Sequence, residues 1–139
     1  MARNITILGS TGSIGHSALK VIRAYPEELR VSGLSTHRDV ETLHGQVEEF
    51  HPETVAIMDA DAAAEFSIHH PGLTVLSGIN GLCDLASMDC DVVLCGVVGG
   101  IGLRPVLSAI ENGNRVALAN KEPMVMAGEL IMATAKSKG

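Results

Sequence analysis

Aromatic side chains are almost absent from this sequence. Its 139 residues include no tryptophan, one tyrosine and two phenylalanines, although 46% of all residues are hydrophobic. The core therefore has to consist mainly of Val, Ile, Leu, Ala and Met, a composition that suits helices packed on a parallel β-sheet. The length is sufficient for one domain that buries a core of its own.

Clustered positive charge is also missing. Ten Lys and Arg residues stand against 16 Asp and Glu, the net charge is −6, and no run of Lys or Arg occurs. Because nucleic-acid binding depends on clustered cations that neutralise phosphates, this balance argues against a nucleic-acid partner. The longest apolar run, residues 92–103, contains four glycines and is too short to span a membrane as a helix.

Cysteine is scarce, and its spacing excludes a common metal motif. The sequence contains an odd number of cysteines without CxxC spacing, namely Cys83, Cys90 and Cys95. We therefore expect reduced, buried thiols rather than a disulfide or a metal site. Residues 1–4 lead directly into a predicted strand and leave no room for a signal peptide. Together these features favour a cytoplasmic location.

The sequence does contain a regular alternation of strand and helix patterns. Short β-rich segments are predicted at residues 4–8, 30–35, 54–58, 73–76, 91–95 and 115–119. Helical patterns are predicted at residues 14–24, 40–50, 80–87, 103–112 and 123–138, and in an alanine-rich segment after Asp59 and Asp61. Such alternation predicts right-handed βαβ crossovers and a parallel sheet. We therefore predict a single α/β domain over residues 1–139, a Rossmann-like doubly wound parallel sheet in which strand 91–95 is fully buried.

A glycine-rich loop connects the first predicted strand to the first predicted helix. It begins at Gly9 and reads GSTGSIG, at the position where backbone N–H groups and a helix dipole hold a pyrophosphate in dinucleotide-binding folds. We expect Gly9 to permit the tight turn, Gly12 the close approach of a phosphate and Gly15 the packing of the helix. Thr11 and Ser13 can add hydroxyl donors. A glycine turn without a ligand is the alternative.

The end of the second predicted strand bears on the choice of cofactor. NAD-binding folds usually carry Asp or Glu there to bond the ribose hydroxyls, whereas this sequence reads Ser-Thr-His-Arg at residues 35–38. The Arg38 guanidinium suits a 2′-phosphate, so NADPH is favoured over NADH. Asp39 opposes this interpretation unless it caps the next helix, and Arg38 as a solvated loop cation is the alternative.

Three polar residues follow the last predicted strand. Asn120, Lys121 and Glu122 lie at its carboxyl end, the edge at which open α/β sheets bind ligands. Asn120 would bond the cofactor, Lys121 would meet an anionic or hydroxylated substrate, and Glu122 would hold the lysine in place. A capped helix start with a charged first turn is the alternative.

The remaining acids and the histidines do not suggest a metal centre. Asp59 and Asp61 are interpreted as helix caps rather than catalytic acids. The six histidines are interpreted as scattered, and the adjacent pair His69 and His70 is placed in a loop far along the chain from the cofactor edge. We assign no metal ligand in this chain.

These motifs together resemble the N-terminal domain of the 1-deoxy-D-xylulose 5-phosphate reductoisomerase family. The resemblance rests on ITILGSTGSIG at residues 5–15, GVVGGIGLRP at 96–105 and ALANKE at 117–122, in order along nearly the whole chain. The residues it implies for the phosphates and 2′-phosphate of NADPH are Thr11, Gly12, Ser13, Ile14, His37, Arg38 and Asp39. Asn120 and Glu122 are implied to contact NADPH, and Lys121 to touch the substrate.

The resemblance also implies an activity for the parent enzyme. The family isomerises the sugar phosphate 1-deoxy-D-xylulose 5-phosphate to an aldehyde and reduces it with NADPH to 2-C-methyl-D-erythritol 4-phosphate, an isoprenoid precursor. Mg or Mn chelates the substrate oxygens, and the parent enzyme is expected to be a homodimer. Because the family's Asp-Ser-Glu metal motif and its later domains lie beyond the matching residues, we expect this chain to bind NADPH without turnover.

Two departures and two rival interpretations accompany this resemblance. His-Arg-Asp at residues 37–39 replaces the usual Gly, basic residue and Asn, and Pro123 replaces a serine. One rival is a stand-alone NAD(P)-responsive regulatory module, because a fold does not fix a function. Such a module would not need a substrate-binding lysine at the position of Lys121. Another NADPH-dependent reductase, such as a homoserine or semialdehyde dehydrogenase, would lack the Leu-Ala-Asn-Lys-Glu string.

Overall fold

The computed structural model describes residues 2–97 and 100–118, and within them six strands form one sheet. In chain order the strands are β1 (Arg3–Leu8), β2 (Leu29–Thr36), β3 (Thr54–Ile57), β4 (Thr74–Ser77), β5 (Val92–Cys95) and β6 (Arg115–Leu118). Every pairing between neighbours is parallel, and the spatial order is β4-β3-β2-β1-β5-β6. The predicted doubly wound parallel sheet is confirmed.

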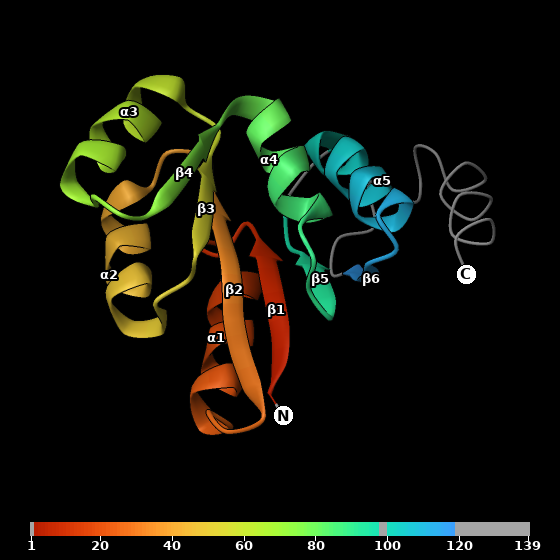
Figure 1. Ribbon diagram of the computed structural model, residues 1–139. Helices are drawn as coiled ribbons and strands as arrows, with labels where there is room; N and C mark the ends of the chain where they lie inside the picture. The colour runs from red at the N-terminus through yellow and green to blue at the C-terminus, as the bar shows by residue number, and fades with distance from the viewer. Residues whose placement is uncertain (1, 98–99, 119–139) are drawn as a thin grey trace.

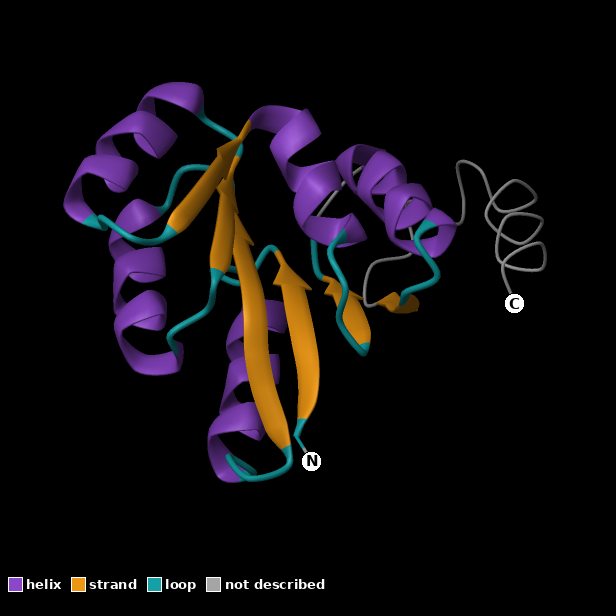
Figure 2. Cartoon of the chain, in the orientation of Figure 1, coloured by secondary structure: helices purple, strands orange, loops and turns teal. Residues whose placement is uncertain are grey.

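The helices of the described chain cover both faces of this sheet. They are α1 (Ser13–Ala24), α2 (Val40–Phe50), α3 (Ala60–His69), α4 (Gly78–Ser87) and α5 (Leu103–Glu111), with the short 3-10 helix η1 (Gly100–Gly102) before α5. Figures 1 and 2 show α1, α2 and α3 on one face and α4 and α5 on the other. None of these helices combines the length and hydrophobicity that crossing a membrane requires.

One apolar cluster on each face explains this arrangement. Ile7 of β1 packs in a cluster that α1, α2 and α3 complete, for example through Leu43 and Phe66. Leu8, the next residue of β1, packs in the other cluster with α4 and α5. Both side chains are fully buried, because successive residues of a strand point to opposite faces and both faces of this strand are covered.

The chain reverses its direction across the sheet between β1 and β5. It builds outward from β1 through β2 and β3 to β4, then returns through α4 to β5 on the other side of β1. The segments that leave the carboxyl ends of β1 and β5 therefore lead to helices on opposite faces. Open α/β sheets bind ligands in the crevice that such a reversal creates.

The predicted element boundaries agree with the structure to within two residues wherever the structure describes them. Asp59 caps α3 as predicted, since its carboxylate accepts a hydrogen bond from the Ala62 N–H at 3.0 Å. The prediction of Asp61 as a cap is wrong, because Asp59 holds that position and Asp61 lies inside the first turn. The prediction of a loop at residues 69–70 is also wrong in part, because α3 extends through His69. The predicted helix 123–138 lies outside the described residues.

Strand β5 is less buried than expected. Val93 and Cys95 are inaccessible, but Val92 and Leu94 point to the other face, where the described helices cover them only partly. The three thiols are free, as predicted, although only Cys95 is fully buried. Burial raises the pKa of the Cys95 thiol, which favours its neutral form.

Candidate functional site

The glycine-rich loop lies at the carboxyl end of β1 and leads into α1. Gly9 has a φ of 79°, a left-handed conformation that favours glycine, and its carbonyl accepts a hydrogen bond from the Gly12 N–H at 3.2 Å. A Cβ at Gly9 would lie 3.1 Å from the carbonyl carbon of Gly96, which follows β5. Gly9 thus makes the expected tight turn and also brings the loops after β1 and β5 together.

The other two glycines of the loop differ in their surroundings. A Cβ at Gly15 would overlap the backbone of Ser10, so only glycine lets α1 pack this closely against the loop. A Cβ at Gly12 would meet only the Gly9 carbonyl oxygen, at the ordinary contact distance of 3.6 Å. The space above Gly12 is therefore open to a ligand that approaches the backbone.

The first turn of α1 exposes its amide end toward this open space. Gly12 is the N-cap residue, no side chain caps the helix, and no acidic residue occupies the first turn. The first amide bonded within this helix is that of His16, which donates to the Gly12 carbonyl at 2.9 Å. The preceding amides and the positive end of the helix dipole form the kind of site that binds phosphate groups.

Buried hydrogen bonds hold the loop to α2, a feature that the sequence analysis did not identify. Ser10 is fully buried, and its hydroxyl donates to the Gln46 side-chain carbonyl at 2.8 Å. The Gln46 amide donates in return to the Ser10 carbonyl at 2.9 Å. Because Gln46 lies on the buried side of α2 with 7% of its surface exposed, this reciprocal pair is shielded from water and rigidifies the loop.

Two residues at the end of β2 fix the loop from the other side. The Ser35 hydroxyl accepts from the Gly9 N–H at 2.7 Å, and its carbonyl accepts from the Ser10 N–H at 2.8 Å. The hydroxyls of Thr36 and Thr11 are hydrogen-bonded at 2.7 Å. The Thr11 hydroxyl is therefore already engaged, so it reaches a ligand only with its remaining donor or acceptor capacity.

The turn at residues 37–39 is exposed, as the predicted 2′-phosphate position requires. Asp39 caps α2, since its carboxylate accepts from the Thr42 N–H at 3.2 Å. This cap resolves the objection that Asp39 raised, because a capping carboxylate is directed to its own helix. The Arg38 guanidinium makes no ion pair within residues 2–97 and 100–118, which leaves its charge available.

A cleft of about 220 Å³ connects these features. Its lining combines the phosphate loop, the end of β2 and the segment after β5, namely Gly9, Thr11, Gly12, Ser35, Thr36, His37, Met58, Leu82, Gly96, Val97 and Ile101. The mixture of backbone, hydroxyl and apolar groups suits a ligand with both phosphates and planar apolar parts. Asn120, Lys121 and Glu122 lie outside the described residues, so their predicted places at this edge stay predictions.

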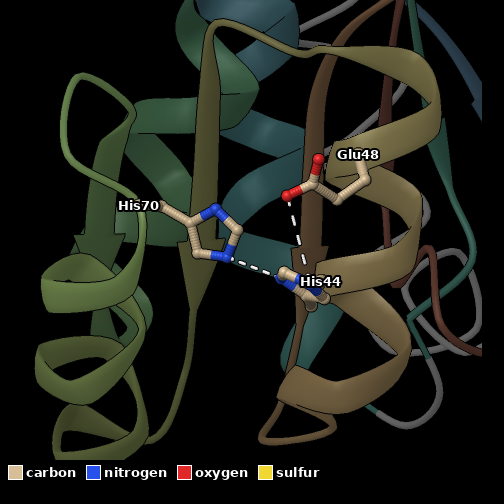
Figure 3. A group of neighbouring side chains, drawn as sticks. All are labelled: His44, Glu48 and His70. Atoms are coloured by element: carbon tan, nitrogen blue, oxygen red, sulfur yellow. Dashed lines mark hydrogen bonds and ion pairs between the residues drawn. The ribbon is translucent and has the colours of Figure 1, made fainter.

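The histidines are not all scattered, which corrects the sequence analysis. His44 of α2 and His70, which ends α3, share a hydrogen bond of 2.9 Å, and Glu48 lies beside them (Figure 3). Residues 44 and 70 are far apart along the chain but meet because α2 and α3 lie on the same face of the sheet.

Comparison with known proteins identifies similar chains over most of this sequence. A family model described as 1-deoxy-D-xylulose 5-phosphate reductoisomerase matches residues 5–128. A curated relative of that name from Thermodesulfovibrio yellowstonii is 42% identical over 138 residues, which cover 99% of this chain and 36% of the relative. This chain spans about a third of the length of the curated relatives that it matches.

Solved structures give the same result. The reductoisomerase from Zymomonas mobilis in complex with NADPH is 31% identical, with a TM-score of 0.94 over 100% of this chain and 37% of that chain. A reductoisomerase in complex with NADPH, fosmidomycin and magnesium is 39% identical, with a TM-score of 0.95 over 99% and 35%. An archaeal homoserine dehydrogenase has a TM-score of 0.67 at 16% identity, a likeness of the fold alone.

Proposed function

This chain belongs to the 1-deoxy-D-xylulose 5-phosphate reductoisomerase family, and we propose that it is the NADPH-binding domain of such an enzyme. The observation that carries this proposal is the open amide end of α1 beside the cleft at the β1–β5 reversal. Family membership favours this function over a stand-alone regulatory module. The alternative of another NADPH-dependent reductase, such as a homoserine dehydrogenase, is supported only by a similar fold.

The residues of the loop fit the pyrophosphate of NADPH. Thr11, Gly12, Ser13 and Ile14 would hold it, mainly through backbone amides at the start of α1. The close packing of Gly15 on Ser10 and the bonds of Gln46 fix the loop before a ligand arrives. Such preorganisation lowers the entropy cost of binding.

The turn after β2 fits the 2′-phosphate. Arg38 would pair with it, and His37, which lines the cleft, would lie beside the same group. Asp39 contributes through its place in the turn, while its carboxylate caps α2. Asn120 and Glu122 would contact NADPH and Lys121 the substrate, as the family resemblance implies.

The whole enzyme would convert 1-deoxy-D-xylulose 5-phosphate to 2-C-methyl-D-erythritol 4-phosphate in isoprenoid biosynthesis. NADPH supplies the hydride that reduces the aldehyde, and Mg or Mn would be held by parts of the enzyme other than these residues. The residues of this chain bind and orient the cofactor. The parent would act as a homodimer in the cytoplasm, where free thiols such as Cys83 stay reduced.

Calorimetric titration of the 139-residue polypeptide with NADPH tests this function. We expect one NADPH per chain, and Gly12→Val should weaken binding by more than about tenfold, or about 1.4 kcal/mol. The added side chain would stand between the helix amides and the pyrophosphate, while its Cβ would meet only the Gly9 carbonyl oxygen at an ordinary 3.6 Å.

A matched control uses the same substitution at an open position. Gly45 lies on the exposed side of α2, and a Cβ there meets nothing within 4 Å. Gly45→Val should therefore leave NADPH affinity unchanged. If Gly12→Val, folded by circular dichroism, binds NADPH as tightly as Gly45→Val does, the phosphate loop is assigned wrongly.

A further inference from the structure

Three potential metal ligands meet where α2 passes the end of α3. His44 and Glu48 are one turn apart on α2, with His44 Nε2 4.0 Å from Glu48 Oε1. His70, the C-cap residue of α3, brings its Nε2 within 2.9 Å of His44 Nδ1. Figure 3 shows the three side chains directed toward one another. One ligand atom from each residue lies within 4.8 Å of the other two.

His70 is held in place more firmly than an ordinary surface histidine. Its ring stacks on the buried Phe66, with ring centroids 4.2 Å apart and an interplanar angle of 21°. An imidazole whose orientation is fixed by packing loses little conformational freedom when it binds a metal ion.

The spacing of the two ring nitrogens suits chelation. Two nitrogens bound to one tetrahedral zinc at about 2.0–2.1 Å lie about 3.3 Å apart. On binding, the rings would give up the proton that they share, turn both lone pairs toward the ion and separate by a few tenths of an ångström. Glu48 is exposed on its helix, with 63% of its side-chain surface accessible, and is free to swing toward an ion. Water can occupy the fourth position because the cluster faces solvent.

We propose that His44, Glu48 and His70 form a binding site for one divalent transition-metal ion, with zinc as the foremost candidate. Two imidazoles and one carboxylate are ligands that zinc, cobalt and nickel accept, whereas magnesium prefers oxygen ligands. The ion links α2 to the end of α3. Neither the position nor the chemistry of this site depends on the proposed cofactor site, which lies at the β1–β5 reversal.

Titration of the metal-free 139-residue polypeptide with ZnCl₂ tests the proposal. We expect one ion per chain and a higher melting temperature with zinc, because a ligand that binds the folded state stabilises it. His44→Ala and His70→Ala should each weaken zinc binding by more than about tenfold, in line with losses of 10–100-fold on removal of groups that merely support metal ligands. Glu48→Gln should weaken it less than either histidine variant.

Two controls make the result specific. His16→Ala removes an exposed histidine from α1 and should leave zinc affinity unchanged. His44→Gln keeps a side chain of similar size on α2 and separates loss of the ligand from loss of the fold, which circular dichroism monitors for every variant. Bound Co²⁺ should show a visible spectrum without a thiolate charge-transfer band, because no cysteine belongs to the site.

The zinc site is supported if the His44 and His70 variants lose zinc binding while His16→Ala retains it. The proposal is overturned if the parent polypeptide binds no zinc, if His16→Ala weakens binding as much as His44→Ala does, or if the cobalt spectrum shows a thiolate band.

Discussion

Replacing Gln46 by leucine should lower the free energy of unfolding by about 2–4 kcal/mol. The change removes two buried hydrogen bonds to Ser10, each with a net value of about 0.5–1.5 kcal/mol. It also leaves the buried Ser10 carbonyl without the Gln46 donor, which adds a desolvation cost of about 1–3 kcal/mol. The Ser10 hydroxyl can still donate to the Ser35 carbonyl, 3.1 Å away. The expected loss of unfolding free energy is therefore smaller than the sum of these contributions.

The same substitution should affect cofactor binding. Gln46 does not line the cleft, so it acts only by holding the phosphate loop in place. If the loop samples other conformations in Gln46→Leu, the fraction of chains ready to bind falls and the apparent affinity falls with it. We expect NADPH binding to weaken by about tenfold, which corresponds to about 1.4 kcal/mol.

Equilibrium unfolding in urea measures the first effect and calorimetry the second. The midpoint should shift to lower urea while the slope stays constant, as expected for a folded-state loss. A cycle with Ser10→Ala isolates the hydroxyl bond, whose coupling energy should be about 0.5–1.5 kcal/mol. An unchanged midpoint in Gln46→Leu, or zero coupling in the cycle, would refute the role assigned to this pair.

Three other predictions concern the cofactor site. Arg38→Glu should weaken NADPH binding by at least about 1.5–3 kcal/mol, the range for a charged hydrogen bond. It should not weaken NADH binding in calorimetry, because a glutamate at this position can bond the ribose hydroxyls; equal losses would contradict pairing with the 2′-phosphate. In urea unfolding, Gly15→Ala should destabilise the fold by about 3 kcal/mol because the added Cβ overlaps the Ser10 backbone. The control Gly45→Ala, on the open side of α2, should stabilise the fold by about 0.5–1 kcal/mol in the same assay. The polypeptide mixed with NADPH, 1-deoxy-D-xylulose 5-phosphate and Mg²⁺ should show no loss of NADPH absorbance. Steady turnover would contradict the proposal that this chain binds the cofactor while other parts of the enzyme hold the metal.

The features that the sequence predicted correctly depend on local pattern. Alternating strand and helix periods gave the sheet, and acidic residues before helices gave the caps at Asp39 and Asp59. The turn at Gly9 follows from a glycine placed directly after a strand. Each of these features is determined by a few neighbouring residues, so local sequence patterns are sufficient to predict it.

The features that it missed depend on residues far apart in the chain. Ser10 and Gln46 are 36 residues apart, and Ser10 and Ser35 are 25 apart. Serine and glutamine are common on exposed surfaces, so nothing in the residue types indicates that these are buried together. The helical spacing gives one weak indication, because Gln46 occupies the same side of α2 as Leu43 and Val47. A polar residue on that buried side needs a buried hydrogen-bond partner.

The two proposed sites differ in what creates them, and this difference can be tested. The cofactor site is made largely of backbone amides at the start of α1, whereas the metal site consists of three side chains on α2 and α3. Gly12→Val should therefore weaken NADPH binding by more than about tenfold and leave zinc binding intact, while His44→Ala should do the reverse, because mutations at separate sites without shared contacts act independently. Titrating both variants with both ligands gives four affinities. If either substitution weakens both ligands, its effect comes from damage to the fold, and the separate assignment of that site fails.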